Sequence, residues 1–211
     1  RAVTTSSHAL VLAARAQDIA LEARAYSLRG NCNIFLGQYD EARDCLLRAL
    51  ELAKATDSGR VQMETVRILG VLAEEQGDFA AQSRYLTEAL ALARRLGDLM
   101  NERRALNSLG VASLNRGKHR RALAYYQESL AIARAIGDRM GQGVVLGNMG
   151  VQASNLGEYK RAQELFEEAL QIARETDDHT GINISVLNLA GVFSHMGEIE
   201  AAMERYEEAM R

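Results

Sequence analysis

A period of 40 residues runs through the whole chain and restricts it to repeat architectures. Glycine recurs at this spacing without an insertion or a deletion, at Gly30, Gly70, Gly110 and Gly150. A second glycine column follows seven residues later, at Gly37, Gly77, Gly117, Gly157 and Gly197. A fixed period of this length is typical of solenoids, in which each unit stacks on its neighbours. The period predicts a single array made of a half repeat and five repeats, at residues 1–17, 18–57, 58–97, 98–137, 138–177 and 178–211.

Each repeat is predicted to contain two helices of about 17 residues joined by short turns. Between Gly30 and Ala53 the apolar residues recur every three or four positions, which is the spacing of a helix. Gly37 is suited to end the first helix, because glycine readily adopts the left-handed conformation found there. The second helices are expected to end at Gly97 and Gly137, each followed by an aspartate that suits the next N-cap. The chain contains no proline, and the predicted fold is an all-α solenoid of about 11 helices.

Small residues inside the predicted helices indicate close packing. A glycine within a helix costs about 1 kcal/mol relative to alanine, so the column that begins at Gly30 implies a contact that a larger side chain would block. Alanines such as Ala42 and Ala49 are expected to have the same role on the second helices. Large residues are expected to fill the alternate sites, at Leu46, Leu86, Tyr126, Phe166 and Tyr206.

This pattern resembles the tetratricopeptide repeat (TPR), and the resemblance extends over essentially the whole chain. The matching residues of repeat 98–137 are Leu106, Leu109, Gly110, Gly117, Ala122, Tyr126, Ser129 and Leu130. Those of repeat 138–177 are Leu146, Met149, Gly150, Gly157, Tyr159, Ala162, Phe166, Ala169 and Leu170. The repeat length and the runs 131–139 and 148–150 are similar to the Pins/LGN scaffold subtype, and equally to the repeats of bacterial MalT-like and AfsR-like signalling ATPases. The resemblance implies a right-handed superhelix in which the first helix of each repeat lines a concave groove.

The resemblance also implies which side chains face that groove, namely a stripe on the first helix of each repeat. The stripe consists of Arg24, Ser27, Asn31, Glu64, Arg67, Val71, Arg104, Asn107, Val111, Val144, Gly147, Asn148, Val151, Ile184, Leu187, Asn188 and Gly191. Its first half is charged, and its second half is small and apolar. Asn148 and Asn188 stand where related repeats hold a peptide backbone with an asparagine amide, which both donates and accepts hydrogen bonds.

We therefore expect a partner polypeptide to place charged residues on the first three repeats and apolar residues on the last two. The alternative is that Val71, Val111 and Val151 only fill space between helices and that the asparagines are solvated.

The first helix of repeat 138–177 is unusually rich in glycine, at Gly141, Gly143, Gly147 and Gly150. No strand precedes these glycines and their spacing is wrong, so a nucleotide site is not expected. Three interpretations remain open. The helix is a weak, flexible joint, or it allows a ligand backbone to approach closely at Gly147, or the glycines reflect sequence drift in a tolerant repeat.

No arrangement of catalytic or metal-binding residues emerges from the sequence. The histidines His8, His119, His179 and His195 lack metal-ligand spacing, so no enzyme activity, no metal and no cofactor are expected. The net charge of −3 argues against nucleic acid as a partner. No apolar run reaches the roughly 18 residues of a membrane span, and the two isolated cysteines fit a cytoplasmic location.

The expected function is a non-catalytic protein–protein interaction module within a larger cytoplasmic signalling or scaffold protein. Two alternatives stay open: the effector-sensing arm of a MalT-like signalling ATPase and transcription regulator, which would bind a small molecule, and a structural spacer. The chain begins at Arg1 and stops in mid-pattern, so we expect it to be a piece of a longer protein. Apolar residues at its ends are expected to stay partly exposed and to favour end-to-end self-association, namely Leu10, Val11, Met203 and Met210.

Overall fold

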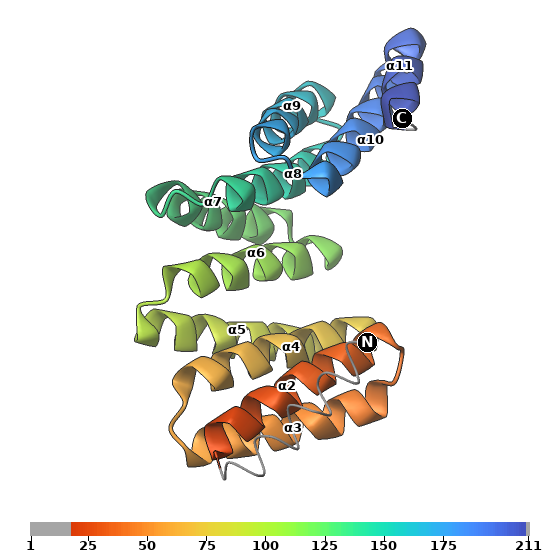
Figure 1. The fold of residues 1–211 in the computed structure, drawn as a ribbon. Coiled ribbons are helices and arrows are strands. Elements are labelled where there is room, and N and C mark those ends of the chain that lie inside the picture. Colours follow the sequence, from red (N-terminus) through yellow and green to blue (C-terminus); the bar gives the residue numbers. More distant parts are fainter. Residues whose placement is uncertain (1–17, 210–211) are drawn as a thin grey trace. The chain divides into compact units, whose positions relative to one another are not determined.

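The computed structural model describes residues 18–209, and within this range every regular element is an α-helix (Figure 1). The helices are α2 (Ile19–Phe35), α3 (Tyr39–Ala55), α4 (Gly59–Glu75), α5 (Phe79–Leu96), α6 (Leu99–Asn115), α7 (His119–Ala135), α8 (Arg139–Asn155), α9 (Tyr159–Glu175), α10 (His179–Met196) and α11 (Ile199–Ala209). The predicted all-α solenoid is confirmed, with ten helices in this range where about 11 were expected for the chain. The predicted half repeat 1–17 lies outside the described residues, as does Met210.

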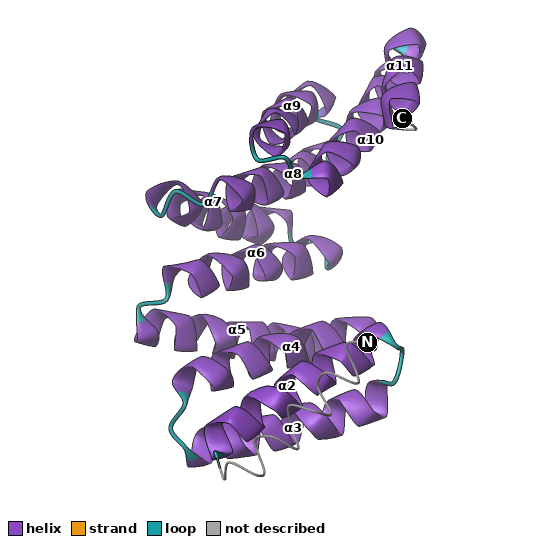
Figure 2. Cartoon of the chain, viewed as in Figure 1, coloured by secondary structure: helices purple, strands orange, loops and turns teal. Residues whose placement is uncertain are grey.

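The short turns between the helices, drawn in teal in Figure 2, follow from the residues that the repeat places there. Gly37 follows α2 with a φ of 72° and Gly97 follows α5 with a φ of 65°, so both predicted glycine stops are confirmed. Asp177 occupies the same left-handed region, with a φ of 53°. The predicted aspartate N-cap is also confirmed, because the Asp138 carboxylate accepts a hydrogen bond of 2.9 Å from the Gly141 N–H.

The described residues form two compact units, which divide inside α6 between Ala105 and Leu106. In the first unit α2 pairs with α3, α4 pairs with α5, and α4 packs against both helices of the preceding hairpin. In the second unit α8 pairs with α9 and α10 pairs with α11, while α7 packs against α8 and α10 packs against both α8 and α9. Within each unit, therefore, the first helices of consecutive hairpins lie side by side.

In four of the five described hairpins, a large side chain of the second helix packs against a glycine of the first helix. A Cβ atom on Gly110 would lie 2.3 Å from Cε1 of Tyr126, and one on Gly150 would lie 2.6 Å from Cε1 of Phe166. Carbon atoms in contact normally lie about 3.5–4.0 Å apart, so these positions have no room for a side chain. The close packing predicted at this glycine column is confirmed.

The same prediction is wrong for Tyr206 in the last hairpin. Its side chain is exposed, whereas Tyr126 and Phe166 are buried. The reason is that α11 packs against α10 alone among the described helices, so nothing described covers its other side.

Candidate functional site

The first unit contains a cavity of about 310 Å³ between the two first helices α2 and α4. It brings together five residues of the predicted stripe: Arg24, Ser27, Asn31, Glu64 and Arg67. Leu21, Ala25, Leu28 and Ile68 complete the lining. The cavity is therefore a mixed surface, with two arginines and one glutamate set among aliphatic side chains.

Arg67 is the central charge of this cavity. Its side chain is half-buried, and it makes no hydrogen bond or ion pair to any residue of the described range. Burial lowers the pKa of Arg67, the neighbouring Glu64 charge opposes that shift, and the nearby Arg104 charge adds to it. A half-buried guanidinium without a direct partner favours an incoming anion, because a carboxylate or phosphate accepts strong charge-assisted hydrogen bonds from it.

Ser27 lies at the floor of the cavity and is only 3% exposed. Its hydroxyl accepts a hydrogen bond of 3.2 Å from the Thr65 hydroxyl, which is itself fully buried. This pair joins α2 to α4. Ser27 therefore contributes first to the packing of the two helices, and only its edge is available to the cavity.

The second unit contains a smaller and more apolar cavity, of about 160 Å³, enclosed by α8, α9 and α10. It gathers six residues of the predicted stripe, namely Val144, Gly147, Asn148, Val151, Ile184 and Asn188. It also contains residues that sequence reasoning missed: Met140, Gly143, Ala169, Ile172, Ala173, Thr176, Asp178, Gly181 and Ser185.

One wall of the second cavity comes from α9. The predicted stripe contains residues of the first helices alone. Ile172 and Ala173 belong to a second helix, α9, and form one wall of the cavity. Both residues are buried. Their spacing along α9 is that of apolar residues on any helix face that packs in a core, so it did not indicate a cavity. The sequence signal for this wall lies on α8, where Gly143 allows Ile172 to pack closely: a Cβ on Gly143 would lie 3.2 Å from Cγ2 of Ile172.

The predicted role of Asn148 as a free amide is modified by the structure. Its Nδ2 donates a hydrogen bond of 2.9 Å to Oδ1 of Asn107, which lies on the part of α6 that belongs to the second unit. Asn188 makes no hydrogen bond to any described residue. The two asparagines that the sequence treats as equivalent therefore differ, and Asn188 has the more available amide.

Six residues of the stripe line neither of these two cavities, and the three valines of the stripe pack against the cores. Val111 and Val151 pack against the core of the second unit, and Val71 packs against the core of the first. This is the space-filling role that the sequence left open as an alternative for the three valines, although Val151 also reaches the second cavity. The stripe residues outside both cavities are Val71, Arg104, Asn107, Val111, Leu187 and Gly191.

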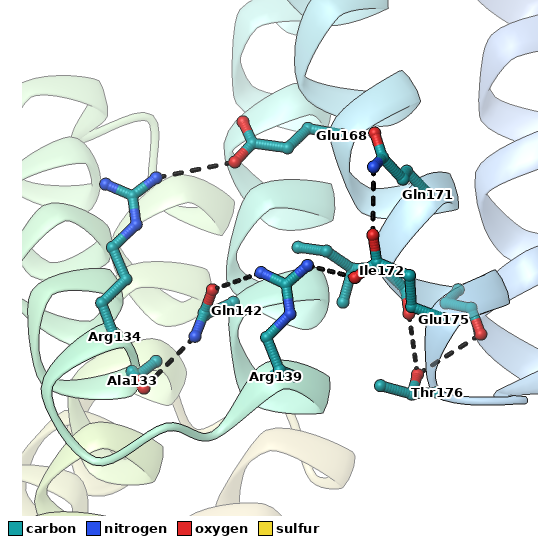
Figure 3. A network of polar contacts seen from close by, with 10 residues as sticks. Ala133, Arg134, Arg139, Gln142, Glu168, Gln171, Ile172, Glu175 and Thr176 are labelled. Atoms are coloured by element: carbon teal, nitrogen blue, oxygen red, sulfur yellow. Dashed lines mark hydrogen bonds and ion pairs between the residues drawn. The ribbon is translucent and has the colours of Figure 1, made fainter.

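A polar network holds the rim of the second cavity in place (Figure 3). Arg139 at the start of α8 is ion-paired with Glu175 at the end of α9, and it also donates to Oε1 of Gln142 at 3.0 Å. The hydrogen bond from Arg139 is the main reason that the pKa of Glu175 is lowered, and a second hydrogen bond from Gln171 adds to it. The network links the first turn of α8 to the last turn of α9 at the surface, next to the cavity.

Metal-ion sites and membrane-spanning helices are both absent from the described part of the chain. No three His, Cys, Asp or Glu side chains between residues 18 and 209 lie close enough to hold a metal ion. No helix in that range is both long and apolar enough to cross a membrane.

The chain is an α-solenoid of stacked helical hairpins. The paired helices and the glycine contacts within the hairpins define this class. The tetratricopeptide repeat family profile matches residues 62–135 and 141–211, and a second profile of the same repeat matches residues 23–55. The chain therefore belongs to the tetratricopeptide repeat family. No curated protein matches the sequence.

Solved structures support the same fold. BtubC (BKLC) from P. vanneervenii has a TM-score of 0.85 at 20% identity, with 100% of this chain and 89% of that chain covered. A Rap protein complexed with competence and sporulation factor has a TM-score of 0.79 at 19% identity, covering 90% of this chain and 53% of that one. A signal transduction ATPase with a tetratricopeptide repeat sensor from Pyrococcus horikoshii has a TM-score of 0.78 at 17% identity, covering 90% and 30%.

Proposed function

We propose that this chain is a non-catalytic interaction module that binds segments of a partner polypeptide on the exposed faces of its first helices. The observation that carries the proposal is that each unit has a cavity on this face, lined by stripe residues. Both cavities contain polar groups, Arg67 and Asn188, with no hydrogen-bond partner in the described part of the chain. Both residues are half-buried, so their polar groups are accessible to an incoming ligand, to which a guanidinium can donate and with which a carboxamide can exchange hydrogen bonds.

The two cavities favour different parts of a ligand. The first unit offers Arg24, Arg67 and Glu64 and suits charged side chains, whereas the second unit offers mainly aliphatic groups. The solved structures include a Rap protein complexed with competence and sporulation factor, which is in line with ligand binding by this fold.

The wider context is part of the same proposal. We place the module in a larger cytoplasmic signalling or scaffold protein, with repeats of the 40-residue kind found in Pins/LGN scaffolds and MalT-like regulators. The likeness to an ATPase with a tetratricopeptide repeat sensor supports the effector-sensing arm as the second candidate. Self-association through the ends also remains a proposal, supported by Met203 on α11, which is exposed.

Peptide-display selection on the chain tests the proposal. The parent is compared with Arg67→Gln in the first unit and Ile184→Gln in the second. Each variant has a matched control away from both cavities. Arg95→Gln removes an exposed arginine of α5, and Ile199→Gln removes an isoleucine that is 58% exposed, against 54% for Ile184.

Peptides that bind the parent and both controls, but lose affinity for Arg67→Gln or Ile184→Gln, support polypeptide binding on these faces. Circular dichroism of all five proteins confirms that folding is unchanged. If no peptide is enriched, or if the controls lose affinity equally, the proposal is wrong. The small-molecule sensor and the spacer then become the better explanations.

A further inference from the structure

We infer that the cavity enclosed by α8, α9 and α10 is a specificity pocket for one uncharged apolar side chain, whose flanking main-chain amides bind Ser185 and Asn188. The inference rests on the proposed function and deepens it, because it names the chemistry of the residue that the second unit selects.

The size and walls of the cavity fit a single apolar group. Its volume is about 160 Å³, close to the roughly 150 Å³ of an apolar protein cavity that accepts one benzene molecule. Val144, Ile172, Ala173 and Ile184 form the walls. A leucine, isoleucine, methionine or phenylalanine side chain fits this space, whereas a larger ring system does not.

The polar groups of the cavity separate into those already used by the fold and those left for a ligand. The Thr176 hydroxyl donates to the Ile172 carbonyl at 2.9 Å, and the Asp178 carboxylate accepts from the Gly181 N–H at 3.0 Å. Asn148 donates to Asn107. All three are satisfied, at least in part, by their neighbours.

Ser185 and Asn188 are different. Ser185 is only 5% exposed and lines the cavity, yet its side chain makes no hydrogen bond to any residue in the described range. Asn188 also lines the cavity without such a partner. The two residues are three positions apart on α10 and so lie on the same face of the helix. A hydroxyl and a carboxamide can each donate and accept, which matches the N–H and C=O of one peptide unit.

The cavity selects against charge. No lysine, arginine or histidine lines it, and its one carboxylate, Asp178, already caps α10. Burying a charged side chain here would remove its water without supplying a partner, which is strongly unfavourable. The first unit, with Arg24 and Arg67, presents the opposite preference.

Gly147 leaves open space at the lining of this pocket. A Cβ on Gly147 would meet no atom within 4 Å, so the missing side chain is not required by helix packing. The open space lies on the cavity lining. The glycine costs the helix stability and leaves room for a ligand backbone, which is the close-approach interpretation of the glycine-rich helix.

Titration of the isotopically labelled chain by NMR with three blocked amino acids tests the inference. N-acetyl-leucine N-methylamide supplies an apolar side chain and two neutral amides, the alanine analogue lacks the side-chain bulk, and the glutamate analogue carries a charge. The leucine probe is expected to shift backbone signals of residues 143–151 and 181–188. The alanine and glutamate probes are expected to do so on the order of tenfold more weakly.

Two variants with matched controls locate the effect. Gly147→Leu fills the cavity and is expected to weaken binding of the leucine probe at least about tenfold. Its control is Gly191→Leu, because a Cβ on Gly191 also meets no atom within 4 Å but the residue does not line the cavity. Ser185→Ala is expected to weaken binding about two- to tenfold. Its control is Ser113→Ala, a buried helical serine of α6 that also lacks a side-chain hydrogen bond within the described chain.

The inference is overturned if the leucine and glutamate probes bind equally, or if Gly147→Leu leaves binding of the leucine probe unchanged. Its failure can be told apart from failure of the proposed function. Display-selected peptides that bind the parent and Gly147→Leu equally would remove the pocket and keep polypeptide binding. A leucine probe that binds while no peptide is enriched would keep the pocket and assign it to a small apolar ligand.

Discussion

Two glycines one turn apart on α8 are expected to respond in opposite directions to the same substitution. Gly147 and Gly150 are both interior to the helix, so alanine at either position gains about 1 kcal/mol of helix propensity. At Gly147 nothing opposes this gain, because the new Cβ meets no atom within 4 Å. At Gly150 the new Cβ would lie 2.6, 2.8 and 2.9 Å from three ring carbons of Phe166. The Phe166 ring is buried, so moving it would disturb the packed core around it.

The magnitude follows from these contacts. Overpacking a dense core costs about 1–3 kcal/mol. Gly147→Ala should therefore raise the free energy of unfolding by about 1 kcal/mol, and Gly150→Ala should leave it lower than Gly147→Ala by about 1–3 kcal/mol. For a chain of this size that difference corresponds to about 2–12 °C in Tm.

Urea denaturation with an unchanged m-value, supported by calorimetry, measures the difference. Phe166→Leu should lower the free energy of unfolding of the parent. In the Gly150→Ala background its effect on that free energy should be more favourable by at least about 1 kcal/mol, because the two sites are in contact. Equal stabilisation by Gly147→Ala and Gly150→Ala would refute the argument that the glycine column marks close helix contact.

Three further outcomes are expected. Thr65→Val should cost about 1–3 kcal/mol by leaving the buried Ser27 hydroxyl without its partner, and adding Ser27→Ala should recover most of the loss; additive losses in urea denaturation would contradict this. Burial, followed by the charge of Glu75, raises the pKa of Glu74, so Glu74 contributes stability at low pH that is lost as the pH rises through its folded-state pKa. Glu74→Gln should therefore gain stability relative to the parent as the pH increases from about 4.3 upward, and a pH-independent difference in denaturation midpoints would count against it. Met203→Glu should reduce concentration-dependent association in sedimentation velocity, and unchanged association would exclude α11 as a contact surface.

Much of the fold could be predicted because its determinants are local. Gly37 and Gly97 end helices through their own backbone freedom, and Asp138 caps α8 through a hydrogen bond to a residue three positions on. The 40-residue period then repeats these local instructions. Tyr206 shows the limit of that reasoning, since the same register position is exposed where no described helix packs over it.

The candidate site was predicted only in part. Of the predicted stripe, the structure brings Arg24 and Arg67 together in one cavity, and Val144 and Ile184 in the other. The predicted stripe did not include Ser185. The position of a serine in a helix does not predict whether its hydroxyl has a hydrogen-bond partner. That property depends on the neighbouring helices and not on spacing along the chain.

The sequence by itself determined the repeat, the helix ends and the glycine contacts, since each follows from backbone conformation or from side-chain volume at a fixed register. The tertiary structure alone decided how the polar groups are shared. It paired Asn148 with Asn107 and Thr65 with Ser27, and it left Asn188 and Ser185 without partners among the described residues. It also placed the wall of α9 against Gly143. Residues about 40 positions apart meet only through the crossing of two helices, so side-chain reach across that crossing sets the outcome.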